Sequence, residues 1–230
     1  MKTRKSRPMG VYWINLDRST ERRQNMLKVL KDPVFDGMVK HRVKAIDGKL
    51  VTKEEIESTF ENVDKEQSVK EYCCFLSHIK ALRQFLKSSH SIALILEDDI
   101  SLDYKPYWQE TIQDCIRNAP EDWEILQLCF FGDTLPKQLY SPKHIHSATA
   151  YIIRKKAAQQ LMKKMQPLFT LDEKLNPTTD IYLYKALKTY VYRYPFFTFE
   201  NKDSTLFEKK VLVGRKHSKQ NLKKLLQIQG

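Results

Sequence analysis

The chain has 230 residues, of which 41% are hydrophobic and 30% are charged, a composition typical of an ordered globular protein rather than a disordered or fibrous one. Its net charge of +12 comes from the two ends, because residues 1–7 hold four basic side chains and residues 209–230 hold seven, both without an acid. The body between them is nearly neutral, so we do not expect nucleic acid as the main partner.

The chain opens with a pattern typical of a strand, a turn and a helix. Residues 11–16 form an apolar run, and the polar cluster that follows resembles a helix cap. We expect the helix to turn Met26, Leu27 and Leu30 toward the core. It should end near Pro33, because proline disfavours a helical residue before it.

A long helix and a central strand are predicted next. Residues 51–69 are polar and charged, and we expect a surface helix or a flap there. Between Val69 and Phe85 the apolar residues recur every three or four positions, which predicts an amphipathic helix. Residues 92–96 are continuously apolar, as expected for a central strand that is covered on both faces.

The second half of the chain continues the alternation of strands and helices. We predict strands at residues 124–131 and 148–153, and helices at residues 155–165 and 178–187. The last of these helices opens at Thr178, a residue type favoured as a helix N-cap. The alternation predicts an α/β fold whose mostly parallel sheet has helices on both faces.

We expect one domain over residues 1–208 and a basic tail or helix over residues 209–230. If the tail is helical, its apolar residues gather largely on one side, and these are Leu222, Leu225, Leu226 and Ile228. Such a helix suits either docking on the body or binding to an anionic membrane surface.

The four cysteines show no zinc-site spacing and no C-x-x-C pair, and they are Cys73, Cys74, Cys115 and Cys129. We expect buried free thiols, which favour a reducing compartment. Neither a signal peptide nor a run of 18 apolar residues is visible, so we expect a cytoplasmic protein, peripheral to a membrane if the tail binds one.

Three acids follow the most apolar strand, at the end where ligands bind in open α/β sheets. Glu97, Asp98 and Asp99 would repel one another there unless a cation offset their charge. Hard divalent ions such as Mn²⁺ or Mg²⁺ prefer carboxylate oxygens. The alternative is that these acids only solvate a turn and cap the next helix.

Two further groups of polar residues lie near the predicted strand ends. The turn after the first strand carries Asp17, Arg18 and Arg22, and its guanidinium groups suit a pyrophosphate or a uracil-type ring. Ser77 and His78 lie on the helix before the acidic strand. The arginines could instead decorate a helix surface, and the Ser77–His78 pair could be a structural hydrogen-bonding site.

The chain resembles glycosyltransferase family 25, which includes lipooligosaccharide and collagen hydroxylysine galactosyltransferases. The segments that carry the resemblance are residues 14–23, 45–48, 74–81, 93–99 and 147–153, together with Asp180 and Asp203-Ser204-Thr205. The order and spacing of residues 74–81 and 93–99 are the most specific part. Many members have Gly at Tyr72 or Cys73 and Gln at Phe199 or Glu200, which indicates a different acceptor or donor preference.

The resemblance implies a GT-A-like, Rossmann-type fold and inverting transfer of a hexose, usually galactose, from a UDP-sugar. The acceptor would be a hydroxyl of a glycan or of collagen-type hydroxylysine. Asp99 would be the direct ligand of Mn²⁺ or Mg²⁺, and Glu97 a further ligand. The donor would be bound by Asn15, Asp17, Arg18, Arg22, Ser77, His78, Glu97 and Asp98.

Inverting transfer also needs a general base near the acceptor hydroxyl, and a carboxylate at a helix start is suitable. Asp180 is our candidate, and its alternative role is that of a plain N-cap. Two other functions stay open. The chain could be a catalytically inactive, transferase-like binding module, or a metal-dependent phosphohydrolase.

Overall fold

A seven-stranded sheet with the order β2-β1-β3-β7-β5-β8-β6 forms the centre of the computed structural model, which describes residues 9–64, 67–143, 145–165, 178–200 and 209–229. Its strands are β1 (Met9–Asn15), β2 (Val39–Lys44), β3 (Ile92–Glu97), β5 (Ile125–Gln127), β6 (Tyr140–Ser141), β7 (Ala150–Arg154) and β8 (Thr189–Tyr192). Strands β2, β1, β3, β5 and β8 run in one direction, and β7 and β6 run in the other. The prediction of a mostly parallel sheet is confirmed.

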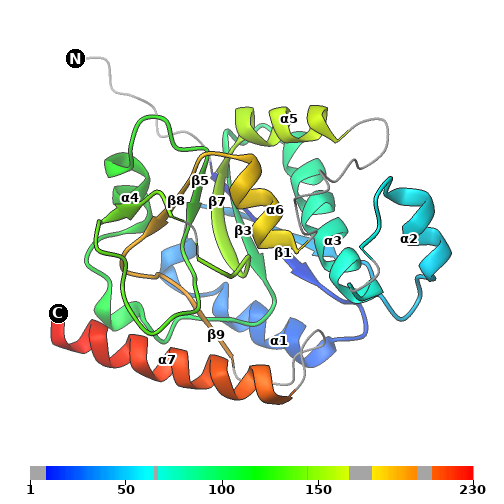
Figure 1. The fold of residues 1–230 in the computed structure, drawn as a ribbon. Coiled ribbons are helices and arrows are strands. Elements are labelled where there is room, and N and C mark those ends of the chain that lie inside the picture. The colour runs from blue at the N-terminus through cyan, green and yellow to red at the C-terminus, as the bar shows by residue number, and fades with distance from the viewer. Residues whose placement is uncertain (1–8, 65–66, 144, 166–177, 201–208, 230) are drawn as a thin grey trace.

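Helices cover both faces of this sheet, as Figure 1 shows. The helices are α1 (Thr20–Val29), α2 (Lys53–Thr59), α3 (Val69–Leu86), α4 (Ile112–Asn118), α5 (Lys155–Lys164), α6 (Thr179–Ala186) and α7 (Lys209–Gln229). Helices α3, α5 and α6 lie on one face and α1 on the other. A short antiparallel pair, β4 (Ile100–Ser101) with β9 (Thr198–Phe199), stands apart from the main sheet.

Each face of the sheet has its own apolar core, because successive side chains of a strand point to opposite sides. On β1, Tyr12 and Ile14 join the core under α3, whereas Val11 and Trp13 join the core under α1. The central strand β3 is buried over residues 92–96, as its continuous apolar run predicts. Burial on both faces holds β1 and β3 in place, and the carboxyl ends of these two parallel strands lie at the same edge of the sheet.

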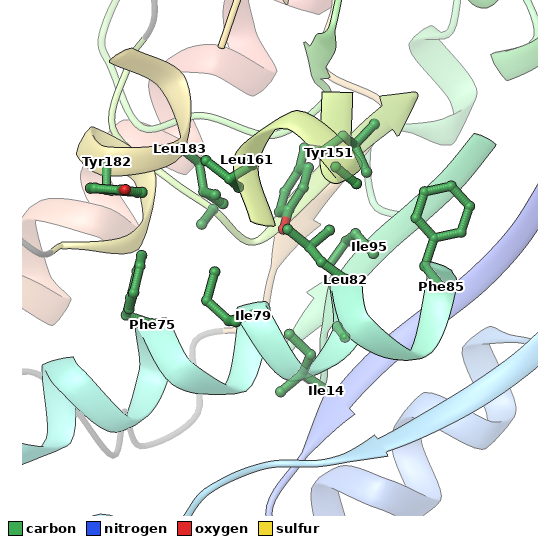
Figure 2. Packing of buried hydrophobic residues seen from close by; sticks show 14 of the residues in the cluster. Ile14, Phe75, Ile79, Leu82, Phe85, Ile95, Tyr151, Leu161, Tyr182 and Leu183 are labelled. Carbon is green, nitrogen blue, oxygen red and sulfur yellow. The ribbon is translucent and has the colours of Figure 1, made fainter. Parts of the chain in front are cut away.

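Helix α3 has a clear start and one apolar side. Ser68 and Glu71 form a capping box, in which each side chain accepts a hydrogen bond from the other residue's backbone N–H. Figure 2 shows the buried side of the helix facing α5, α6 and β7, with Phe75, Ile79, Leu82 and Phe85 in the packing. The helix predicted from the spacing of apolar residues is therefore confirmed.

Strand β7 runs antiparallel to its neighbour β3, with Leu94 opposite Ile152. Its amino end therefore lies at the same edge of the sheet as the carboxyl ends of β1 and β3. The loop before β7, residues 145–149, is brought to that edge. The sequence predicts this strand but not its direction.

Helix α7 packs along the body through its second half. Leu222 and Leu226 are buried in a cluster with Tyr104, Phe130 and Val191. The docked form of the predicted tail helix is thus the one observed, and it uses part of the apolar side that membrane binding would need. Ile228 is 81% exposed. Within the described ranges no helix is long and apolar enough to span a membrane, and binding to an anionic surface stays a prediction.

Other sequence-based expectations differ from the structure. Met26 and Leu30 are buried as predicted, but Leu27 is 43% exposed. Fewer side chains of α1 therefore face the core than the sequence predicts. The strand expected at residues 124–131 is limited to β5, because the residues after Gln127 leave the ladder while staying buried. The basic start, residues 1–7, and the motif at residues 203–205 lie outside the described residues.

Gly10 on β1 packs closely against His90, and a substitution at Gly10 tests this packing. A methyl group at Gly10 would overlap the imidazole ring of His90, which hydrogen-bonds the hydroxyl of Tyr12 at 2.9 Å. We expect Gly10→Ala to lower the free energy of unfolding by about 1–3 kcal/mol in urea titrations, as overpacking does. At Gly132 the nearest atom to an added methyl is 3.9 Å away. Gly132→Ala should therefore be close to neutral, and equal losses in the two variants would contradict the packing.

Candidate active site

A cleft of about 780 Å³ opens at the edge of the sheet where β1 and β3 end. Its size is within the usual range for small-molecule sites. Nine of the ten residues that the sequence singles out line it, namely Asn15, Arg18, Arg22, Ser77, His78, Glu97, Asp98, Asp99 and Asp180. The register explains part of this convergence. Ile14 pairs with Glu97 in the parallel ladder, so Asn15 and Asp98 leave their strands side by side.

Asp17 is the exception, because it does not line the cleft. Its carboxylate lies 2.6 Å from Arg42 Nη2 and 2.7 Å from Lys44 Nζ, both on β2. These hydrogen bonds from Lys44 and Arg42 lower the pKa of Asp17 to about 2. The position favours a structural link between β1 and β2 over the predicted contact with a donor.

Asn15 is buried and hydrogen-bonds Asp98, the middle one of the three acids. Its Nδ2 donates to Asp98 Oδ2 at 2.6 Å, and its Oδ1 accepts from Arg42 Nε at 3.0 Å and Arg23 Nε at 3.2 Å. The side-chain amide is therefore occupied by protein groups. Asn15 would act on a donor through the position of Asp98 rather than by direct contact.

Arg22 lies between two of the three acids. Its Nη2 is 2.7 Å from Asp98 Oδ1 and 2.8 Å from Asp99 Oδ2. Burial opposes the charge of Arg22, but the negative charges of Asp99, Asp98, Glu97 and Glu200 outweigh it and raise its pKa. Burial raises the pKa of Asp98 despite Arg22 and Asn15. Oxygens of Asp98 and Asp99 thus converge on one cationic group.

Glu97 faces a different neighbour. Its Oε1 is 3.3 Å from His78 Nε2, and the other ring nitrogen of His78 is 3.2 Å from the hydroxyl of Tyr151. His78 is buried, and Cys74, one helical turn earlier on α3, lies beside the same group. The three acids therefore divide into two sets, one around Arg22 and one around His78.

Ser77 forms a hydrogen bond with the loop that follows β2. Its hydroxyl donates to Cys73 O at 2.6 Å and accepts from Ile46 N at 2.9 Å. This is the structural hydrogen-bonding role that the sequence left open. The loop also supplies Asp47, whose Oδ2 lies 2.5 Å from Arg18 Nε at the cleft.

Asp180 holds a strained part of the opposite wall. It is the second residue of α6, and Thr178 occupies the N-cap position, so the N-cap role is wrong. Asp180 Oδ2 accepts from Ser147 N at 2.9 Å, while the hydroxyl of Tyr184 donates to Ser147 O at 2.7 Å. Ser147 has φ of 139°, a conformation that costs about 1–3 kcal/mol outside glycine. Asp180 therefore stabilises this loop.

The sequence missed several cleft residues. Cys74 lines the cleft and is partly exposed as a residue, although burial still raises the pKa of its thiol. All four cysteines are free, as expected. His217 and Ser218 come from α7, and Ser218 Oγ bonds both Gly132 N and Gly132 O at 2.7 Å. Cys74 could have been predicted as a cleft residue, because it belongs to the family-like segment at residues 74–81. His217 and Ser218 could not, because their place at the cleft depends on where α7 docks on the body.

Comparisons with known proteins agree with the resemblance. The chain matches glycosyltransferase family 25 (LPS biosynthesis protein) over residues 9–175. It is 24% identical over 183 residues to procollagen galactosyltransferase 1 of Danio rerio. That alignment covers 69% of this chain and 30% of the relative, so the chain spans about a third of that protein's length.

Two solved structures are also similar at low scores. One is a glycosyltransferase involved in glycosylation of the major capsid of PBCV-1, with a TM-score of 0.42 and 9% identity over 93% of this chain and 99% of that one. The other is a mutant Drosophila beta-1,4-galactosyltransferase 7 in complex with manganese, UDP-Gal and xylobiose, with a TM-score of 0.39 and 12% identity over 90% and 79%. The match over residues 9–175 is the decisive one, and by it the chain belongs to glycosyltransferase family 25.

Proposed function

We propose that this chain transfers a hexose, galactose in the first place, from a UDP-sugar to a hydroxyl of a glycan or of collagen-type hydroxylysine, with inversion and with a divalent metal ion. The observation that carries the proposal is the cleft itself. Residues from four separate segments, which the sequence singles out for this chemistry, line one cavity at the ends of β1 and β3. Family membership and a relative named as a galactosyltransferase support the reaction class.

The acids of the cleft fit a hard divalent ion. Oxygens of Asp98 and Asp99 approach a single nitrogen of Arg22 within 2.8 Å, so they already converge on one positive charge. Mn²⁺ or Mg²⁺ prefers such oxygens, and Asp99 is the proposed direct ligand. Glu97 is the proposed further ligand, although in this structure it lies toward His78. When bound, the ion supplies Lewis-acid stabilisation of the leaving diphosphate.

The chain's own side chains account for the rest of the reaction. Arg18 and Arg22 line the cleft and would stabilise the charge that develops on the diphosphate oxygens. Asp180, on the opposite wall, would take the proton from the acceptor hydroxyl as its oxygen attacks the anomeric carbon. The bond from that carbon to the diphosphate breaks, and its electron pair leaves with UDP.

An acceptor assay separates transfer from hydrolysis. With UDP-galactose alone, a transferase releases UDP slowly, and a suitable glycan or hydroxylysine peptide should raise the rate and appear galactosylated by mass spectrometry. A phosphohydrolase would cleave the diphosphate bridge with water and release UMP and galactose 1-phosphate, at a rate that an acceptor does not change. An inactive binding module would bind the nucleotide sugar and release nothing.

Asp99→Ala tests the metal assignment. We expect Mn²⁺-dependent transfer to fall at least about 100-fold, because several kcal/mol of charge stabilisation would be lost. The fold should persist, since Arg22 keeps its ion pair with Asp98. Asp122→Ala is the control, because Asp122 pairs with Lys188 outside the cleft. Normal turnover in Asp99→Ala would contradict the assignment of Asp99 as the direct metal ligand.

Asp180→Asn tests the proposed base. The amide keeps the shape but cannot take a proton, so kcat should fall by about 100-fold or more while the Kd for UDP-galactose stays the same. Tyr184→Phe is the matched control, because it removes another hydrogen bond to Ser147 and leaves the carboxylate in place. Should both variants lower kcat and the free energy of unfolding alike, Asp180 only stabilises the loop.

A further inference from the structure

A thiol, an imidazole and a carboxylate meet on one wall of the cleft. Cys74 and His78 are four residues apart on α3, so both side chains leave the same face of the helix. Glu97, the last residue of β3, lies opposite them. The ligand atoms of the three residues all lie within 4.8 Å of one another, and His78 Nε2 is 3.3 Å from Glu97 Oε1.

These distances are close to those of a tetrahedral zinc site. Nitrogen and oxygen ligands at about 2.0–2.1 Å from such an ion are about 3.3 Å apart, which is the separation observed between His78 and Glu97. Sulfur binds at about 2.3 Å and would lie about 3.5 Å from the other two ligand atoms, so Cys74 Sγ would approach them by up to about 1.2 Å. To do so it would give up its present contact with Thr179 Oγ1, which lies 3.7 Å away.

Tyr151 already holds the imidazole in the orientation that a metal ligand needs. Its hydroxyl is 3.2 Å from His78 Nδ1, so Nε2 points to Glu97 and Cys74. In Figure 2 the ring of Tyr151 extends from β7 toward α3. Burial raises the pKa of Tyr151 well above its usual value, so the group stays a neutral hydroxyl whose oxygen can accept a hydrogen bond from Nδ1–H of His78. Histidine ligands typically donate their second ring N–H to a hydrogen-bond acceptor in this way.

We infer that Cys74, His78 and Glu97 form a binding site for a thiophilic divalent cation of the Zn²⁺ class, with three protein ligands and a fourth position open to the cleft. The thiol gives up its proton when the ion binds. A mixed set of sulfur, nitrogen and oxygen suits Zn²⁺ better than Mn²⁺ or Mg²⁺, which prefer oxygen alone. The site shares Glu97 with the centre proposed at Asp99, but in this structure the Glu97 carboxylate lies toward His78. The inference therefore does not depend on the proposed function.

Titration of the metal-free full chain with Co²⁺ tests the site directly. We expect a near-ultraviolet thiolate-to-cobalt band that Zn²⁺ removes by competition. Cys74→Ala should lose this band and bind Zn²⁺ at least about tenfold more weakly, since even groups one shell further out contribute that much. Cys73→Ala is the matched control, because the adjacent thiol is buried in the core and not in the cluster. An unchanged band in Cys74→Ala, or no band in the native chain, would overturn the site.

A second measurement uses the native chain, so it stands even if a variant fails to fold. Among the four free cysteines Cys74 is the one that lines the cleft, and its labelling by N-ethylmaleimide can be followed by peptide mass spectrometry. Burial raises the pKa of the Cys74 thiol, so the labelling is slow. Zn²⁺ should protect Cys74 and Mg²⁺ should not. Equal labelling with and without Zn²⁺ contradicts the inference. Asp99→Ala should keep the cobalt band, so loss of transfer and loss of this site are separate outcomes.

Discussion

The cleft depends on how the protein accommodates the negative charge of Asp98 and Asp99 at the buried carboxyl end of β3, beside the end of β1. Their register places Asn15 beside Asp98, so a carboxylate is fixed where burial disfavours its charged form. Arg22 offsets this cost because α1 starts directly after β1 and returns a guanidinium to both Asp98 and Asp99. An isolated acid at this position would be strongly destabilising.

The cleft has two different walls, one made of charged groups at the ends of the strands and one made of a loop held by Asp180. Arg22 and His78 each approach acids at the ends of the sheet strands, whereas Asp180 holds the loop in front of β7. The antiparallel direction of β7 is what brings that loop to the same edge. Apolar cores on both faces fix the strands, so the polar groups stand on rigid elements rather than on long loops.

Local pattern was enough to predict the parts that depend on nearby residues. The apolar spacing of α3 and the continuous apolar run of β3 gave their positions, and the acids after β3 pointed to the cleft. Edge strand β2 was missed because it is largely exposed and carries three basic side chains and a histidine in VKHRVK. The direction of β7, the contact of Asp180 with Ser147 and the exposure of Cys74 follow from pairings between distant segments, which no local pattern encodes.

Helix α7 closes one side of the cleft without being part of the sheet. The family match ends at residue 175, yet Ser218 closes the cleft through two hydrogen bonds to one glycine, Gly132, and Leu222 and Leu226 hold the helix from behind. Lys219 adds further ties, because its side chain pairs with Asp103 at 2.7 Å and its carbonyl accepts from the hydroxyl of Tyr104 at 3.0 Å. A shift of α7 that broke these ties would widen the cleft beside Gly132 and leave the acids of β3 in place. The width of the cleft and the position of its charges are thus set by separate elements.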